Sequence, residues 1–86
     1  MIMSKVYNGD FKGMFRRFAN GSKKSYSSGD WSVAVGGYDC WFEVYYKRTP
    51  IINCINGELN ILNHEIDKNQ MKKLIDIIKS EYDGII

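Results

Sequence analysis

The feature that most constrains the fold of this chain is Asn56-Gly57, a turn pair that falls between two apolar runs. A tight type I′ turn needs positive φ at both central residues, and Asn followed by Gly adopts that conformation readily. The pair therefore predicts a hairpin over 51–62 with one wholly apolar side. The predicted pairs on that side are Cys54 with Leu59 and Ile52 with Ile61. A slip of one residue would bury Asn53 and Asn60 instead, so the alternation also determines the register.

A second hairpin is predicted over 31–46, around the loop 36–39. Extension from that loop sets Val33 opposite Phe42. One face then carries Trp31, Val33, Val35, Cys40, Phe42 and Val44, and the other carries Ser32, Ala34, Trp41, Glu43 and Tyr45. A three-residue loop, 47–49, with Pro50 opening the next strand, joins the two hairpins. It keeps Phe42 beside Cys54 and Val44 beside Ile52. The prediction is a four-stranded antiparallel meander.

The C-terminal part of the sequence predicts an amphipathic helix over 68–82. Asp67 with Gln70 three residues later resembles a capping box, and Ile66 with Met71 stands at the positions of a hydrophobic staple. This helix should pack on the apolar face of the sheet, which makes the fold class α+β. The predicted main core is Phe42, Val44, Ile52, Leu59, Ile61, Leu74, Ile75 and Ile78.

The N-terminal part predicts one short helix over 11–18, followed by a mobile polar loop over 20–29. The apolar residues of this helix fall on one side: Phe11, Met14, Phe15 and Phe18. Gly13 weakens the helix. We expect this segment to cover the second face of the sheet, where Trp41 and Tyr45 lie beside Ala34, Ile51 and Ile55. The alternative is that this face stays exposed as an interaction patch.

Composition is consistent with one small domain spanning residues 1–86. Hydrophobic residues make up 44% and aromatic residues 14%, which is too many for a disordered chain. The sequence contains no apolar run long enough for a membrane span, and residues 1–6 lack a secretory signal, so a cytoplasmic location is expected. In that compartment Cys40 and Cys54 are expected to stay reduced, with a disulfide between them as the alternative.

The sequence favours a protein without enzymatic activity. His64 is the single histidine, and no motif supplies it with a partner for acid–base catalysis. Cys40, Cys54 and His64 lack the close spacing of zinc ligands, and the glycines form no phosphate-binding loop. We therefore predict no catalytic residue, no metal and no cofactor.

Basic residues are concentrated near the N-terminus. Residues 1–48 hold eight Lys and Arg against four Asp and Glu, a charge of +4, whereas the rest of the chain has a charge of −2. The cluster of Arg16, Arg17, Lys23 and Lys24 is interleaved with aromatic residues. Such a cluster can contact phosphates and stack bases, which makes a nucleic-acid-binding module using residues 12–26 one alternative function. A solvated rim around core phenylalanines explains the same pattern.

Binding is the function class that remains, and aromatic side chains are its best anchors. The predicted interface residues are Trp41, Tyr45, Tyr38, Arg16, Arg17, Lys23, Lys24 and Arg48. In size and style the chain is similar to small phage and mobile-element proteins, including anti-CRISPR proteins, although no motif carries that similarity. The leading hypothesis is an inhibitor of a host defence or nucleic-acid-handling complex that acts by protein–protein contact, as a monomer or homodimer without membrane attachment. A structural subunit or homodimer is the third hypothesis.

Overall fold

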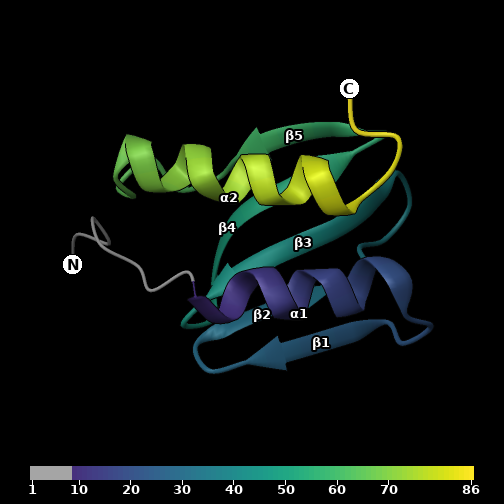
Figure 1. Cartoon of the computed structure of the whole chain (residues 1–86). Helices are drawn as coiled ribbons and strands as arrows, with labels where there is room; N and C mark the ends of the chain where they lie inside the picture. The colour runs from purple at the N-terminus through teal and green to yellow at the C-terminus, as the bar shows by residue number, and fades with distance from the viewer. Residues whose placement is uncertain (1–8) are drawn as a thin grey trace.

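The computed structural model describes residues 9–86. Residues 1–6, for which the sequence predicts no secretory signal, lie outside this range. Within this range, two helices flank five strands (Figure 1). In order they are α1 (Gly9–Asn20), β1 (Ser25–Ser28), β2 (Trp31–Ala34), β3 (Cys40–Tyr46), β4 (Thr49–Ile55), β5 (Glu58–Ile61) and α2 (Lys68–Glu81). The strands form one antiparallel meander in the order β1-β2-β3-β4-β5. The predicted α+β class, antiparallel sheet and C-terminal helix are confirmed.

The number of strands was predicted wrongly, because the sheet has five strands and not four. The additional strand, β1, lies inside the segment 20–29 that was expected to be a loop, and it pairs with β2 along its full length. Its serines give no apolar alternation. Tyr26 anchors it, since its ring meets Phe18 edge-on at 6.2 Å between centroids and its backbone lies opposite Val33.

The β4–β5 hairpin has the predicted register, with Ile52 opposite Ile61 and Cys54 opposite Leu59. Its turn has positive φ at both Asn56 and Gly57, as a type I′ turn requires. The connection between β3 and β4 is shorter than predicted. It is a two-residue turn with positive φ at Lys47 and Arg48, and Ile51 then bulges out of the ladder so that Val44 still lies beside Ile52. The bulge also places Ile51 in the core, not on the second face as predicted.

The β2–β3 register differs from the predicted one by two residues, with Val33 opposite Val44 and not opposite Phe42. The tight turn centres on Tyr38 and Asp39, because the Cys40 N–H donates to the Gly37 carbonyl oxygen. A shift of two residues preserves the faces of both strands, so Trp31, Val33 and Val44 are buried as expected. Val35, however, leaves the strand and is half-exposed.

Both helices lie on the same face of the sheet, side by side and running in the same direction (Figure 1). The expectation that the N-terminal segment covers the second face is therefore wrong. The physical reason is aromatic packing: Phe15 and Phe18 of α1 contact the Phe42 ring at 5.2 and 5.8 Å, on the face that α2 also covers. No described helix lies over the opposite face.

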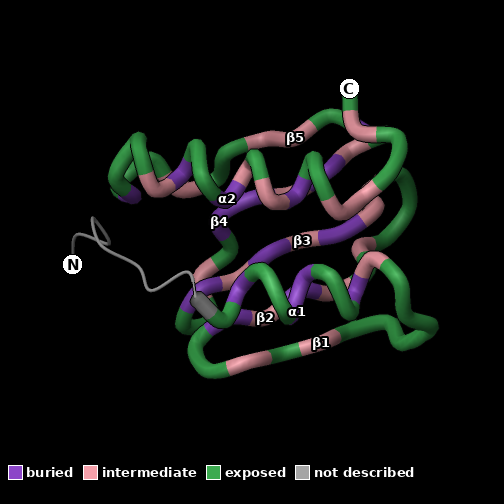
Figure 2. The backbone as a smooth tube through the Cα atoms, viewed as in Figure 1, coloured by how far each residue is buried: buried purple, intermediate pink, exposed green. Residues whose placement is uncertain are grey.

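The core lies between the helices and the sheet (Figure 2). Of the predicted core residues, five are fully buried: Phe42, Val44, Ile52, Leu74 and Ile78. Leu59 is only partly buried and Ile61 is 37% exposed, because β5 is an edge strand, and Ile75 of α2 is also only partly buried. The aromatic residues of α1, together with Trp31, complete the core on the other side of β3.

Candidate binding surface

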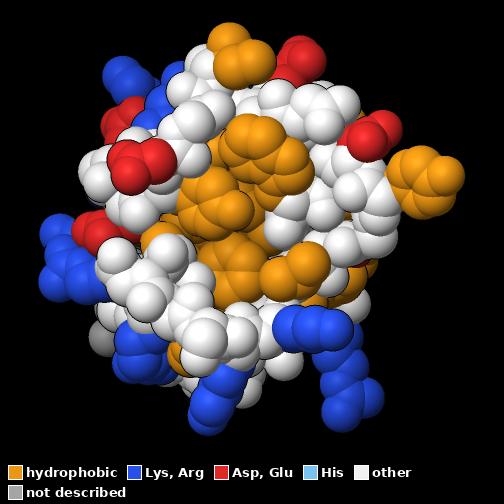
Figure 3. Space-filling view, turned by 90° about the vertical axis from the view of Figure 1, so that its right-hand side faces the viewer, with side chains coloured by type: hydrophobic (Ala, Val, Ile, Leu, Met, Phe, Trp, Pro, Cys, Tyr) orange, Lys and Arg blue, Asp and Glu red, His pale blue; other side chains and the backbone are white. Residues whose placement is uncertain are grey.

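A hollow of about 470 Å³ opens at the end of the molecule where both helices terminate. Seen from that end, apolar side chains gather in the centre of the face, with charged groups around them (Figure 3). Four residues supply the large apolar walls: Phe18, Val35, Trp41 and Tyr82. We refer to this site as the aromatic hollow. Its rim includes Asn20, Gly21, Ser22, Lys23 and Lys24 on one segment and Glu81 and Asp83 on another.

A β-bulge directs Trp41 into the aromatic hollow. Cys40 pairs with Ile55 and Phe42 pairs with Cys54, which leaves Trp41 as an extra residue in β3. A bulge reorients its side chain relative to the alternation of the strand. The Trp41 ring stacks on Tyr82 at 6.1 Å between centroids and 29° between planes. The prediction that Trp41 shares the second face of the sheet with Tyr45 is thus wrong.

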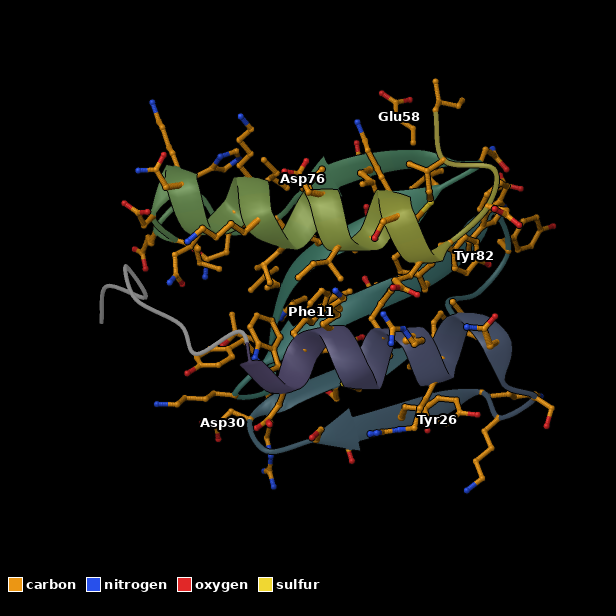
Figure 4. All side chains as sticks on the ribbon, in the orientation of Figure 1. Phe11, Tyr26, Asp30, Glu58, Asp76 and Tyr82 are labelled. Carbon is orange, nitrogen blue, oxygen red and sulfur yellow. The ribbon has the colours of Figure 1, made fainter. Side chains whose placement is uncertain are left out.

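Tyr82 joins the two helices at the base of the hollow. It follows α2 directly, and its backbone N–H donates to the Ile78 carbonyl oxygen, so its ring is held at the end of the helix (Figure 4). The ring contacts Phe42 at 5.0 Å and stacks on Phe18 at 6.3 Å. Partial burial raises the pKa of its hydroxyl. In the sequence, Tyr82 is only the last residue of the predicted helix over 68–82, and this position does not reveal which neighbours its ring meets.

The C-terminal segment closes one side of the aromatic hollow. Gly84 has a φ of 91° and lies against the Trp41 ring, and the Ile86 N–H donates to the Gly57 carbonyl oxygen. Three exposed large apolar side chains belong to this end: Val35, Tyr38 and Ile86. Tyr38 is fully exposed on the β2–β3 loop. Val35 is part of the lining of the hollow, whereas Tyr38 and Ile86 are exposed outside it.

The charges at this end are of both signs. Arg16 donates to both carboxylate oxygens of Glu81 through Nε and Nη2, at 3.0 to 3.2 Å, in the only ion pair among residues 9–86. These hydrogen bonds lower the pKa of Glu81 and raise that of Arg16. Lys23 and Lys24 are exposed on the opposite rim. Arg16 is therefore engaged within the molecule, whereas the two lysines face solvent.

The remaining predicted interface residues lie elsewhere. Tyr45 and Arg17 line a second hollow of about 560 Å³ beside β1, together with Lys23 and several serines. The Tyr45 hydroxyl donates to Glu43 Oε1 at 2.5 Å, and this hydrogen bond raises its pKa. Arg48 sits in the β3–β4 turn, at the end of β3 remote from Trp41. The structure thus brings Trp41, Lys23 and Lys24 together at the aromatic hollow, groups Arg17 and Tyr45 with Lys23 at the second hollow, and leaves Arg48 outside both.

The cysteines and the histidine lie apart from the aromatic hollow's lining. Cys54 is buried, which raises the pKa of its thiol, and both Cys40 and Cys54 are free thiols. His64 lines a different groove, between β5 and α2. Among residues 9–86 no group of three His, Cys, Asp or Glu side chains is placed to hold a metal ion.

Comparison of the chain with known protein families, curated proteins and solved structures finds no match. Within the described range, neither helix has the length and apolar composition needed to cross a membrane.

Proposed function

We propose that this chain is a small binding protein and that the aromatic hollow is its contact surface for a protein partner. The main support for the proposal is the pair of partly exposed rings in the hollow, Trp41 stacked on Tyr82, with Val35 in the same lining and the fully exposed Tyr38 on the β2–β3 loop that leads to Trp41. Interfaces between proteins are enriched in tryptophan and tyrosine, because these residues bury a large rigid area at low entropic cost.

The charges around the hollow support a protein surface as partner. Lys23 and Lys24 lie on one rim and Glu81 and Asp83 on the other, so the rim offers both signs of charge. Complementary charges of this kind orient a partner and raise the association rate more than they raise affinity. The further hypothesis, that the partner is a host defence or nucleic-acid-handling complex inhibited by contact, rests on chain size and composition and stays a prediction.

The test is affinity capture from an extract of cells that carry the gene, with and without nuclease treatment. Trp41→Ala should weaken capture of the partner by about 30-fold, equivalent to about 2 kcal/mol, because a central aromatic anchor is lost. Tyr38→Asn is the companion variant, since Tyr38 is fully exposed and Asn tolerates its positive φ of 54°. Arg48→Ala, at the far end of β3, is the control and should bind like the wild type.

Two results would contradict the proposal. Capture that survives both Trp41→Ala and Tyr38→Asn in folded variants places the binding surface elsewhere. Capture that disappears with nuclease assigns binding to nucleic acid instead. The molar mass of the isolated chain, measured by light scattering, decides separately whether it is a monomer or a homodimer.

A nucleic-acid-binding module is the second candidate, favoured by the hollow that Arg17, Lys23 and Tyr45 share beside β1. Phosphate contacts by these cations predict binding that weakens steeply with added salt. Replacing Arg17, Lys23 and Lys24 together should then abolish a gel shift. Absence of any shift at low salt for the wild type would exclude this candidate.

A further inference from the structure

A third hollow lies on the opposite side of α2, next to the edge of the sheet. A groove of about 420 Å³ runs between α2 and β5. Its walls are mostly apolar: Ile61, Ile66, Met71 and Ile75. Its other lining residues are Asn63, His64, Lys68 and Lys72. We refer to it as the β5 groove; it shares no residue with the aromatic hollow.

The strand beside the groove has a free backbone edge. β5 pairs with β4 on one side only, and no described strand lies on its other side (Figure 1). The Leu62 N–H donates inward to the Ile51 carbonyl oxygen. Because backbone groups alternate along an antiparallel strand, those of Asn60 also point inward, whereas those of Leu59 and Ile61 point outward. Two residues of β5 thus offer an N–H and a C=O each to an added strand.

The side chains of the same two residues point toward the helix face. Leu59 and Ile61 lie opposite Cys54 and Ile52, which are buried under α2. A strand added to this edge would therefore bring every second side chain over the β5 groove, beside Met71 and Ile75. Ile61 is 37% exposed, and such a strand would cover its side chain.

The charge of the residues that line the groove favours an acidic occupant. Its lining contains Lys68, Lys72 and His64 and no carboxylate. Both lysines lie in the first turns of α2, and the Asp67 carboxylate that caps this helix end does not line the groove. Asp76 is exposed one turn further along α2 and does not line the groove (Figure 4). An acidic side chain at the α2 N-terminal end of the groove would be attracted.

The two edge strands, β1 and β5, differ in the side chains that they offer to an added strand. On β1 the Val35 N–H donates to the Lys24 carbonyl oxygen, so the backbone groups of Lys24 and Tyr26 point inward to β2. The outward backbone groups of β1 therefore belong to Ser25 and Ser27. Small polar residues give an added strand little to bury. The apolar, cation-rimmed groove is found beside β5.

We infer that the β5 groove binds an extended acidic peptide segment of a partner protein by strand addition to β5. The peptide carries apolar side chains at alternate positions, which enter the groove, and an aspartate or glutamate beside Lys68 and Lys72. Main-chain hydrogen bonds to Leu59 and Ile61 supply affinity, and the groove supplies sequence preference. This site is independent of the proposed function of the aromatic hollow.

The probe is a random-peptide phage library selected on the wild-type protein, with the enriched peptides then synthesised and titrated. We expect peptides with alternating apolar residues and at least one acidic residue. On binding, the amide protons of Leu59 and Ile61 should gain protection from hydrogen exchange, while that of Asn60, already in the ladder, should change little.

Two pairs of variants test the contacts. Lys72→Glu should weaken binding by about threefold to tenfold, because it removes an attraction and adds a repulsion. Lys73→Glu is the matched control, being exposed on the same helix but outside the groove. Ile61→Pro removes an outward donor that no described strand uses, whereas Ile61→Ala keeps that donor; a larger loss with proline identifies strand addition.

Four results would overturn the inference. In the first two, the selection enriches no peptide, or it enriches peptides without alternating apolar residues or without acidic residues. In the other two, Lys72→Glu and Lys73→Glu bind a peptide equally well, or binding is lost with Tyr38→Asn and not with the β5 variants. A concentration-dependent dimer that Ile61→Pro makes monomeric would show that a second copy of the chain occupies the edge. If Ile61→Pro fails to fold, the lysine pair and the exchange data still decide.

Discussion

Helices α1 and α2 cover the same face of one sheet, but they are held there by different chemistry. α1 packs through rings, with Phe15 alone in contact with Phe11, Phe18, Phe42 and Tyr82. The buried residues of α2 are aliphatic or thioether side chains: Met71, Leu74 and Ile78. α2 also begins at a side-chain cap, where Asp67 accepts from the N–H groups of Asn69 and Gln70. α2 is therefore specified largely by its own sequence, whereas α1 depends on partners distant in the chain.

Truncating one buried residue of each helix gives the largest expected loss of stability. Phe15→Ala should lower the free energy of unfolding by about 3 to 5 kcal/mol and Leu74→Ala by about 2 to 4 kcal/mol, since both side chains are fully buried. Urea denaturation followed by tryptophan fluorescence and by circular dichroism measures both. Coincident transitions show that the two helices unfold as one unit. An unchanged midpoint for Phe15→Ala would contradict the packing of α1 on the sheet.

The next largest effect is expected at Gly57, in the β4–β5 turn that lies against the Trp41 ring. In Gly57→Ala the new methyl group would lie 2.7 Å from the Gly84 carbonyl oxygen and 3.2 Å from the Trp41 ring, at a φ of 87°. We expect a loss of about 1 to 3 kcal/mol and altered tryptophan fluorescence. Gly37→Ala is the control, because nothing lies within 4 Å of its added methyl group. Equal stability of the two variants would argue against this turn geometry.

The cap of α2 should contribute less. Asp67→Ala leaves two N–H groups of the first turn without their acceptor and should cost about 0.5 to 2 kcal/mol. Asp67→Asn keeps an acceptor and should stay close to the wild type. Thermal unfolding of the two variants beside the wild type checks the difference. If Asn is as destabilising as Ala, the side-chain oxygen does not act as the cap.

A single substitution within α1, by contrast, should stabilise the folded protein. Gly13 is exposed within the helix, with nothing within 4 Å of an added methyl group, so Gly13→Ala should stabilise the protein by about 0.5 to 1 kcal/mol. Gly21→Ala is the contrasting variant: its methyl group would collide with the Tyr26 hydroxyl and lie 2.6 Å from the Arg17 carbonyl oxygen. It should destabilise, and a shift of the same sign for both variants would contradict the helix end at Asn20.

The same contrast explains what could be predicted from the sequence. The β4–β5 register follows from Asn56-Gly57, and the start of α2 follows from Asp67, because each signal acts within a few residues. The strand β1 could not be predicted, since Ser25–Ser28 lacks apolar alternation and is placed by Tyr26 against Phe18 and Val33. Its pairing depends on contacts that only the folded chain makes.

The candidate site was harder to predict than the fold, for a related reason. Lys23, Lys24 and Trp41 were identified as candidates, but the alternation rule assigned Trp41 to the wrong surface. A bulge arises from how the lengths of neighbouring strands and turns fit together, which local sequence does not reveal. Tyr82 and Val35 joined the site through a helix end and a register shift, and neither leaves a motif.

The smallest effect belongs to the ion pair that ties the two helices together, Arg16 with Glu81. Arg16 is more than half exposed, so the pair is screened by solvent and contributes little, and less at high salt. Hydrogen bonds from Arg16 depress the pKa of Glu81 in the folded state. The contribution is therefore present above the unfolded carboxyl pKa, about 4.3, and is lost as the pH falls through the lower folded value.

Glu81→Gln should accordingly be slightly less stable than the wild type at neutral pH and low salt, and equal to it in acid or concentrated salt. Glu65→Gln is the control, because the Glu65 carboxylate makes no ion pair within residues 9–86. Melting temperatures of the three proteins, measured over a pH and salt series, check the sign. If the difference between Glu81→Gln and the wild type grows as the pH falls, the pair does not stabilise the folded state, and contact between the two helices rests on the ring of Tyr82 against Phe15 and Phe18.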